Sequence, residues 1–257
     1  MLMHDWPVPD NVAIAMTDRH GGVSLAPYDS LNLGLHVGDI PQQVLVNRGL
    51  LAQQLQLATE PVWLEQVHGT RVIDLADIVP INLTQDAQSE CVSLQNTPPL
   101  VADASYTDLA GRVCVVMTAD CLPVLLCNQQ GTEVAAAHAG WRGLCDGVIE
   151  ATVAHFTSKP NELIAYLGPA IGPSAFEVGA EVRAAFMAKD PNAESCFIAR
   201  GDKYLADIIG LAKLRLKQLG ITQIHSADIC TVLNQDYFSY RRDKITGRMA
   251  SLIWLKS

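Results

Sequence analysis

The spacing of apolar residues along the chain predicts both helices and strands. Apolar residues recur at intervals of three and four in 42–57, 144–156, 179–189 and 203–219, which is the pattern of a helix with one buried face. Shorter apolar runs, several of them rich in β-branched residues, predict strands at 12–16, 62–66, 71–75, 113–118, 122–127, 133–138, 163–168, 224–229 and 248–255. Strands therefore dominate the middle of the chain.

The segment 113–138 holds consecutive strand runs joined by short polar connections. The connection at 128–131, NQQG, suits a hairpin turn, so we expect the runs to be neighbouring strands. Helices lie before and after this block without a regular alternation of strand and helix. This arrangement favours an α+β fold, with a mixed β-sheet core and helices packed in layers, over a doubly wound fold.

The chain shows no repeat of fixed period, no heptad pattern and no long linker. The nearest feature to a domain boundary is the polar stretch 81–99, which we interpret as a surface excursion. The sequence therefore predicts one catalytic domain spanning residues 1–257.

Composition and charge narrow the classes of function. Of the 257 residues 49% are hydrophobic, and the formal net charge of -9 argues against a nucleic-acid surface, which needs a basic patch. The N-terminal residues MLMHDWPVPD lack the basic start and apolar run of a secretory signal. The longest apolar runs are far shorter than the ~20 residues of a membrane-spanning helix. We expect a cytoplasmic monomer that acts on a small molecule, with no membrane or nucleic-acid partner.

The seven cysteines do not predict disulfides, because the number is odd and no C-x-x-C pair occurs. Four of them lie in apolar surroundings and are interpreted as small core residues: Cys114, Cys127, Cys145 and Cys230. Cys91 and Cys196 are expected in loops.

Three residues that can bind a metal lie at the predicted ends of elements. His68 follows a strand-like run and precedes a glycine, and Cys121 lies in TADCLPV, where Asp120 and Pro123 predict a bend. His138 ends the run EVAAAH and precedes AGWRG, a strand-to-helix junction. Two imidazoles and a thiolate form a known ligand set for catalytic zinc, with the fourth position open to water or substrate. Such a site supports hydrolytic chemistry. Taken singly, a histidine is more often a hydrogen-bonded structural residue, and a cysteine in a sheet is usually a core residue.

Other polar residues have a functional and a structural interpretation. Cations beside glycines or turns suit phosphate or a ribose-linked group, although each is also compatible with a surface ion pair: Arg19, Arg142, Arg241 and Arg242. Asp103 and Asp120 can act as a general base or as the partner of a metal ligand, or can simply form turns. Trp141 is interpreted as a packing residue, with base stacking as the alternative.

Ordered motifs from Arg19 to the C-terminus carry a family resemblance. They are R-x-G-G-V-S at 19–24, L-N-L-G at 31–34, Q-V-H-G at 66–69, A-D-A at 102–104, T-A-D-C-x-P-V at 118–124, A-H-A-G-W-R-G at 137–143, G-P-A-I-G-P at 168–173, E-V-G at 177–179 and S-Y-R-R-D-x-x-T-G-R at 239–248. The sequence resembles the zinc-dependent purine nucleoside phosphorylase and adenosine deaminase family, also labelled polyphenol oxidase or laccase-domain proteins. It departs from the family pattern at Asp18, Ser174, Ala175 and Phe176.

The resemblance implies a cytoplasmic enzyme with a fold like that of the cysteine-hydrolase-like toxins. It implies phosphorolysis of adenosine, inosine, guanosine and methylthioadenosine, together with deamination of adenosine. The implied metal ligands are His68, Cys121 and His138, with zinc as cofactor and copper as an alternative. Catalytic roles are expected for Cys121, His138 and Asp120, and substrate-binding roles for Arg19, Gln66, Arg142 and Arg241.

Two other functions remain open at this point. Cys121 with His138 as its base would give a metal-independent hydrolase or amidase, such as one that edits peptidoglycan precursors. A copper centre would give a polyphenol oxidase, since two histidines and one cysteine also suit blue copper.

Overall fold

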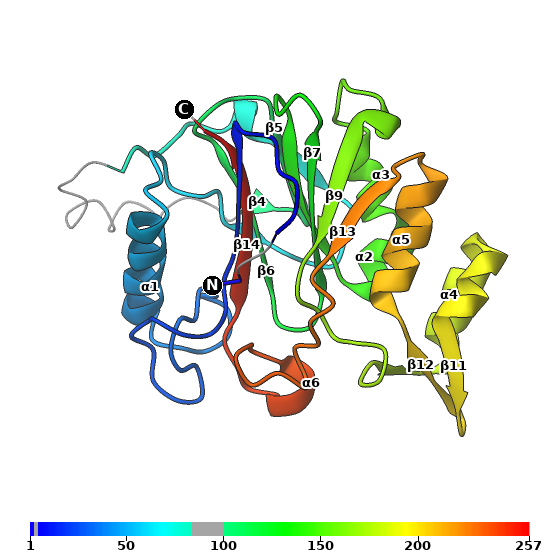
Figure 1. Ribbon diagram of the computed structural model, residues 1–257. Coiled ribbons are helices and arrows are strands. Elements are labelled where there is room, and N and C mark those ends of the chain that lie inside the picture. The colour runs from blue at the N-terminus through cyan, green and yellow to red at the C-terminus, as the bar shows by residue number, and fades with distance from the viewer. Residues whose placement is uncertain (3–4, 84–99, 257) are drawn as a thin grey trace.

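The computed structural model describes residues 1–2, 5–83 and 100–256 (Figure 1). Most of the predicted surface excursion at 81–99, with Cys91, lies outside the described residues. The elements follow in the order β1 (Val12–Met16), α1 (Pro41–Gln54), β2 (Leu64–Glu65), β3 (Val72–Asp74), η1 (Leu75–Asp77), β4 (Leu100–Val101), β5 (Ala104–Thr107), β6 (Val113–Thr118), β7 (Leu122–Asn128), β8 (Val134–Ala139), α2 (Trp141–Asp146), α3 (Val148–Val153), η3 (Pro160–Glu162), β9 (Leu163–Leu167), β10 (Glu177–Val178), α4 (Ala180–Lys189), η4 (Pro191–Cys196), β11 (Phe197–Arg200), β12 (Lys203–Ala206), α5 (Ile208–Gln218), β13 (Gln223–Ser226), α6 (Tyr240–Asp243) and β14 (Met249–Leu255).

Two sheets packed face to face form the centre of this mixed α+β fold. An antiparallel sheet has the strand order β1-β14-β6, and a six-stranded mixed sheet has the order β13-β9-β7-β8-β5-β3. Helix α1 covers the outer face of the first sheet, and α2, α3 and α5 cover the outer face of the second (Figure 1). The result is a helix, two sheets and a helical layer, in that order.

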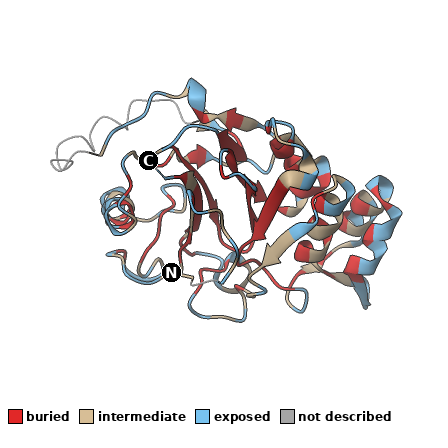
Figure 2. Cartoon of the chain, turned by 45° about the horizontal axis from the view of Figure 1, so that its top comes forward, coloured by how far each residue is buried: buried red, intermediate tan, exposed pale blue. Residues whose placement is uncertain are grey.

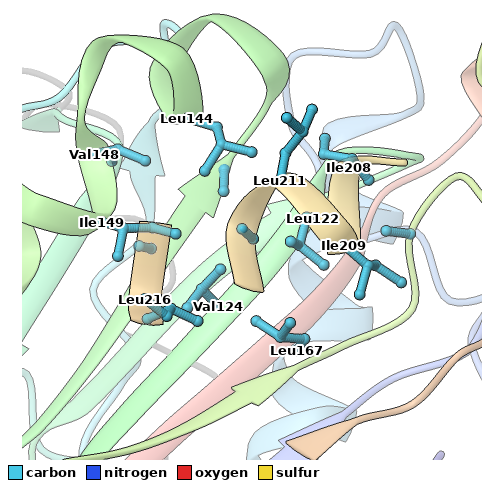
Figure 3. Packing of buried hydrophobic residues seen from close by; sticks show 14 of the residues in the cluster. Leu122, Val124, Leu144, Val148, Ile149, Leu167, Ile208, Ile209, Leu211 and Leu216 are labelled. Atoms are coloured by element: carbon cyan, nitrogen blue, oxygen red, sulfur yellow. The ribbon is translucent and has the colours of Figure 1, made fainter. Parts of the chain in front are cut away.

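Alternate residues of each central strand point to different layers, as the pleat of a strand requires. In β7, Leu125 and Cys127 face the other sheet, whereas Leu122, Val124 and Leu126 face the helices. Because both faces are covered, these strands are buried throughout (Figure 2), and their sequences are continuous apolar runs. Figure 3 shows the helical side of this core, where the following residues pack together: Leu122, Val124, Leu144, Val148, Ile149, Leu167, Ile208, Ile209, Leu211 and Leu216.

The predicted hairpin in the middle of the chain is confirmed, but only for two of its strands. β7 and β8 pair antiparallel, and the turn closes with a hydrogen bond from Gly131 N to Asn128 O at 3.0 Å. β6 instead pairs with β14 in the other sheet. The bend at Asp120, whose φ is 99°, lies in the connection that carries the chain between the sheets. The prediction that β6 neighbours β7 was therefore wrong.

Two predicted helices differ from those observed. The helix expected at 144–156 is divided into α2 and α3 by Gly147, whose φ of 105° ends one helix and starts the next. The helix expected at 203–219 begins only at Ile208, because Asp207 caps it by accepting a hydrogen bond from Gly210 N at 2.9 Å. The residues before the cap form β12, which pairs with β11 and β10 in a small sheet beside α4.

Helix α1 starts where the sequence predicts, with Pro41 in its first turn. Its buried face packs on the first sheet through Leu51 and Ala52, and Asn47 on the same face is hydrogen-bonded to the loop at residues 23–32. Within the described part of the chain no helix is both long enough and apolar enough to cross a membrane.

The described cysteines are all free, in agreement with the prediction of no disulfides. Cys114, Cys127 and Cys145 are buried core residues as predicted, and Cys230 is half-buried. Cys196, expected in a loop, is instead buried in η4.

Candidate metal centre

The three candidate metal ligands converge from separate segments of the chain. His68 follows β2, Cys121 precedes β7, and His138 lies on β8. Their ligand atoms all lie within 4.8 Å of one another, and Cys121 Sγ is 3.7 Å from His68 Nε2. His68 is exposed, Cys121 is half-buried and His138 is buried, so the cluster opens to solvent on the His68 side. Two imidazoles and one thiolate at this separation fit a metal site with a free position.

Asp103, between β4 and β5, fixes both histidines although it is itself fully buried. Its Oδ1 lies 2.8 Å from Nδ1 of His138 and accepts a hydrogen bond from the backbone N–H of His68 at 2.9 Å. Its Oδ2 accepts a hydrogen bond from Gly69 N at 2.6 Å. Because a carboxylate holds Nδ1 of His138, the other ring nitrogen is the one left for a metal. The sequence-based suggestion that Asp103 is the partner of a metal ligand is therefore supported by its contacts.

The charges at the cluster favour the thiolate form of Cys121. Burial alone would raise the pKa of Cys121, but the positive charge of His138 and hydrogen bonds to both imidazoles lower it to about 6. Burial likewise opposes protonation of His138, but the Cys121 thiolate and Asp103 raise its pKa to about 9. A thiolate that forms near neutral pH is the form that binds a metal or acts as a nucleophile.

Two glycines of the motif AGWRG let the first turn of α2 approach the ligands closely. A Cβ on Gly140 would lie 2.6 Å from His68 Cδ2 and 3.1 Å from Cys121 Sγ. A Cβ on Gly143 would lie 2.7 Å from the carbonyl oxygen of Gly69. The His68 loop therefore packs directly on the glycine face of this helix.

A pocket of about 200 Å³ adjoins the cluster, with Cys121 in its wall. Its lining is mostly apolar and includes several aromatic rings: Ala119, Asp120, Cys121, Trp141, Ile171, Phe176, Ile208, Tyr240 and Arg241. An apolar pocket with a few polar groups beside a candidate metal centre is typical of a small-molecule site. Ile171, Phe176, Ile208 and Tyr240 were not predicted as site residues, although Ile171 and Tyr240 lie in the motifs G-P-A-I-G-P and S-Y-R-R-D and Phe176 is a departure from the family pattern.

Asp120 lies in the pocket wall, but both of its carboxylate oxygens are engaged. Oδ1 accepts a hydrogen bond from Thr231 Oγ1 and Oδ2 accepts one from Arg241 N, each at 2.6 Å. These bonds tie the bend before Cys121 to the first turn of α6. These contacts indicate that Asp120 holds the bend and α6 in position. A direct catalytic role for Asp120 stays a prediction.

Two of the predicted substrate-binding arginines lie at this pocket. Arg241 lines it and donates from Nη1 to the carbonyl oxygen of Glu177 at 3.0 Å. Arg142 is exposed and its guanidinium lies 4.4 Å from the ring centroid of Trp141, which lines the pocket. Arg241 is therefore part of the pocket wall, whereas Arg142 lies outside the lining and contacts it only through Trp141.

The other two predicted substrate-binding residues make structural contacts. Arg19 Nε donates to the carbonyl oxygen of Asp29 at 2.7 Å, and its guanidinium lies over the ring of Phe238. Gln66 bonds both the N–H and the carbonyl oxygen of Met117. Gln66 thus joins the segment before His68 to β6. Neither residue lines the pocket, and their roles in substrate binding stay predictions.

Comparison with known proteins agrees with the sequence motifs. The model of the family described as multi-copper polyphenol oxidoreductase laccase matches residues 13–256. The chain belongs to this family. A member from Shigella flexneri named purine nucleoside phosphorylase YfiH is 56% identical over 99% of this chain and 98% of its own length. The purine nucleoside phosphorylase of Haemophilus influenzae is 50% identical over 98% of each chain.

Solved structures of related proteins share the fold of this family member. A Neisseria meningitidis protein that is 48% identical superposes with a TM-score of 0.88 and covers 100% of this chain and 99% of its own. YlmD from Geobacillus stearothermophilus is 30% identical, with a TM-score of 0.82 over 96% of this chain and 93% of its own. The curated relatives carry the name of an enzyme, which supports an enzymatic role for this chain.

Proposed function

We propose that this protein is a purine nucleoside phosphorylase that acts on adenosine, inosine, guanosine and methylthioadenosine at a zinc centre. The observation that carries the proposal is the cluster of His68, Cys121 and His138 beside a pocket lined by aromatic side chains. The names of the full-length relatives agree with this reaction. We also propose that residues 1–257 act as one catalytic domain, because the ligands come from segments far apart in the sequence.

The chemistry of the donors supports zinc as the resident metal. His68, Cys121 and His138 would hold the ion, and Asp103 would keep His138 in the tautomer that binds it. A zinc ion held by three protein ligands supplies Lewis-acid chemistry at its open position. Copper also binds two imidazoles and a thiolate, and an intense visible absorption band after copper loading would favour the oxidase alternative.

Phosphorolysis requires the base and the phosphate to be held on either side of the ribose C1′ atom. An oxygen of phosphate bonds to C1′ as the bond from C1′ to the purine nitrogen breaks. The purine leaves with the bonding electrons and takes up a proton, which yields ribose 1-phosphate and the free base. Trp141, Phe176 and Tyr240 offer faces on which the purine would stack, and such stacking excludes water from the reacting bond.

We further propose that the same site deaminates adenosine. Water would add at the purine carbon that bears the amino group, and ammonia would leave, so inosine would be the product. Release of ammonia from adenosine in the absence of phosphate would separate this activity from phosphorolysis.

One observation favours a second candidate function, a metal-independent hydrolase. Cys121, His138 and Asp103 are arranged like a catalytic triad, in which a nucleophile contacts its base and a carboxylate orients that base. In that reaction Cys121 would attack the carbonyl carbon of an amide, the amine would leave with a proton from His138, and water would then hydrolyse the resulting thioester and restore the thiol. Because the metal and the nucleophile roles compete for one sulfur, chelation separates the two candidates.

The deciding experiment measures phosphate-dependent release of hypoxanthine from inosine. The purified protein is assayed as isolated, after chelation, and after chelation followed by zinc. We expect release that requires phosphate, disappears on chelation and returns with zinc. Cys121→Ala should abolish both zinc binding and turnover, whereas Cys196→Ala, a buried cysteine of η4, should keep both. No release of hypoxanthine in any of these states would instead support the thiol hydrolase, with Cys121 as its nucleophile.

A further inference from the structure

Arg248 approaches the metal centre although it is far from the ligands in sequence. It immediately precedes β14, and the register pairs Met249 with Thr118, so Arg248 lies beside the connection that leads to Cys121. Its backbone N–H donates to Asn32 Oδ1 at 2.9 Å, and its carbonyl oxygen accepts from Leu33 N at 3.1 Å. The backbone of Arg248 is therefore fixed between β6 and the loop that contains L-N-L-G.

The side chain of Arg248 packs on that loop next to His36. A Cβ on Gly34 would lie 2.8 Å from Arg248 Cγ and 3.4 Å from His36 Cε1. The absence of a side chain at Gly34 thus makes room for both residues at one place. Arg248 and His36 form a pair of polar side chains, and we refer to them as the Arg248–His36 pair.

Only one nitrogen of the Arg248 guanidinium donates hydrogen bonds within the described residues. Nη1 donates to the carbonyl oxygens of Thr246 and Gly247 at 3.1 and 3.0 Å. Within residues 1–2, 5–83 and 100–256, Nε and Nη2 of Arg248 make no hydrogen bond and the side chain forms no ion pair. Burial lowers the pKa of Arg248, and the strongest charge opposing that effect is the thiolate of Cys121. A shielded cation without a carboxylate favours binding of an anion.

His36 adds a donor next to this cation. Although the residue is exposed, partial desolvation of its ring together with the positive charges of Arg248, Arg48 and His138 lowers the pKa of His36. The ring is therefore neutral at pH 7 and offers one N–H donor. No residue in the described part of the chain uses that donor.

The other arginines of the region are engaged differently. Arg19 bonds Asp29, Arg241 bonds the carbonyl oxygen of Glu177, and Arg242 pairs with Asp243. Arg142 is exposed and stacks on Trp141 beside the apolar pocket. Arg241 and Arg248 are both half-buried, and in each the Nε and Nη2 groups make no hydrogen bond to the described residues, but Arg241 lines the apolar pocket whereas Arg248 lies outside its lining.

We propose that the Arg248–His36 pair binds inorganic phosphate beside the metal centre, while the purine occupies the apolar pocket. The planar guanidinium offers two free nitrogens, which match two oxygens of a phosphate, and His36 donates to a third. Neither residue lines the pocket that contains Trp141 and Tyr240, so phosphate and nucleoside have separate binding sites. This inference rests on the proposed phosphorolysis and names the residues that hold its second substrate.

The test compares Arg248→Gln with two arginine controls in zinc-loaded protein. Loss of a charge-assisted hydrogen bond should raise the KM for phosphate about ten- to hundredfold and leave the KM for inosine nearly unchanged. Arg183→Gln, which removes an exposed ion pair of α4 with Glu194, should match the wild type. Arg142→Gln tests the alternative that Arg142 binds the phosphate. A larger rise in the phosphate KM in Arg142→Gln than in Arg248→Gln would overturn the proposal.

Direct binding of inorganic phosphate, measured by calorimetry without nucleoside, separates this inference from the proposed function. If the wild type binds phosphate, Arg248→Gln does not, and inosine is never cleaved, the phosphate site stands and the phosphorylase proposal fails. If inosine is cleaved but Arg248→Gln binds phosphate as the wild type does, the phosphate site is refuted. Should Arg248→Gln lose zinc or fail to fold, Arg248→Lys and His36→Gln replace it, each with an expected rise in phosphate KM of about tenfold. An unchanged phosphate KM in both would also refute the site.

Discussion

At the scale of single residues, Asp103 connects the two histidines of the metal centre. Its carboxylate accepts hydrogen bonds from the backbone of Val67, His68 and Gly69 and holds Nδ1 of His138. These bonds and the charge of His138 keep the pKa of Asp103 below its ordinary value, although burial alone would raise it. Asp103 therefore remains a carboxylate at neutral pH, where it orients both ligands.

We predict that Asp103→Asn keeps the fold but weakens zinc binding. Asparagine has the same shape, but its amide nitrogen cannot accept a hydrogen bond from the His68 loop or from His138. Loss of such an orienting partner typically lowers metal affinity about 10- to 100-fold. The measurement is a competition titration with a chromophoric chelator.

The matched control for this prediction is Asp207→Asn at the N-cap of α5. Asparagine caps a helix about as well as aspartate, so this variant should retain both its stability and its zinc affinity. Equal zinc affinity in Asp103→Asn and the wild type would show that Asp103 does not orient the ligands.

The sequence allowed the metal ligands to be proposed but not the phosphate-binding pair. His68, Cys121 and His138 have side chains that bind metals and lie at the ends of strand runs, which allowed a metal site to be proposed, and the family resemblance implied these three as its ligands. Arg248 and His36 are separated by more than 200 residues, and only the pairing of β14 with β6 brings them to Cys121. Such a register between distant strands leaves no local mark in the sequence.

At the scale of elements, patterns within a short window predicted the long central strands well but missed the shorter strands β4, β5, β10, β11 and β12. β1 and β6 have the bounds that the apolar runs indicate, and β7, β8, β9 and β14 differ by a residue. The prediction at 144–156 missed the break at Gly147, and the prediction at 203–219 started too early, because the helical periodicity continues across Gly147 and Asp207. There the backbone conformation of glycine and the side-chain cap of aspartate outweighed the periodicity.

The two glycines of the helical segment after β8 should respond differently to substitution. Gly143→Ala places a Cβ within 2.7 Å of the carbonyl oxygen of Gly69, so it should displace the His68 loop and lower zinc affinity. Gly147→Ala makes only ordinary van der Waals contacts, the nearest at 3.4 Å to Glu150 Oε2, but it forces alanine into a left-handed conformation, which should cost about 1 to 2 kcal/mol of stability.

Thermal unfolding and zinc titration of both variants distinguish these effects. Gly147→Ala should show a lower Tm in the chelated protein with unchanged zinc affinity. Gly143→Ala should instead lower the zinc affinity strongly and the Tm of the chelated protein only slightly. Normal zinc affinity in Gly143→Ala would mean that α2 does not hold the His68 loop in place.

At the scale of the whole molecule, the site lies where the chain crosses from one sheet to the other. Cys121 ends the connection from β6 in one sheet to β7 in the other, and His138 lies on β8 beside β7. The mixed α+β layering was predicted, but not which strand belongs to which sheet. Strands buried on both faces have similar apolar sequences, so their partners are decided by packing between distant segments.

Metal binding should consequently stabilise the whole fold. Zinc held by His68, Cys121 and His138 would link three segments, and these ligands are brought together only in the folded state. Free zinc at a hundredfold excess over its Kd should add about 2.7 kcal/mol to stability, or about 5 to 10 °C in Tm for a chain of this size. Scanning calorimetry of the chelated and the zinc-loaded protein measures this shift, and Cys121→Ala should remove it while Cys196→Ala retains it. Equal Tm values with and without zinc would argue that Cys121 is a free thiolate, because a ligand that binds only the folded protein must raise its stability.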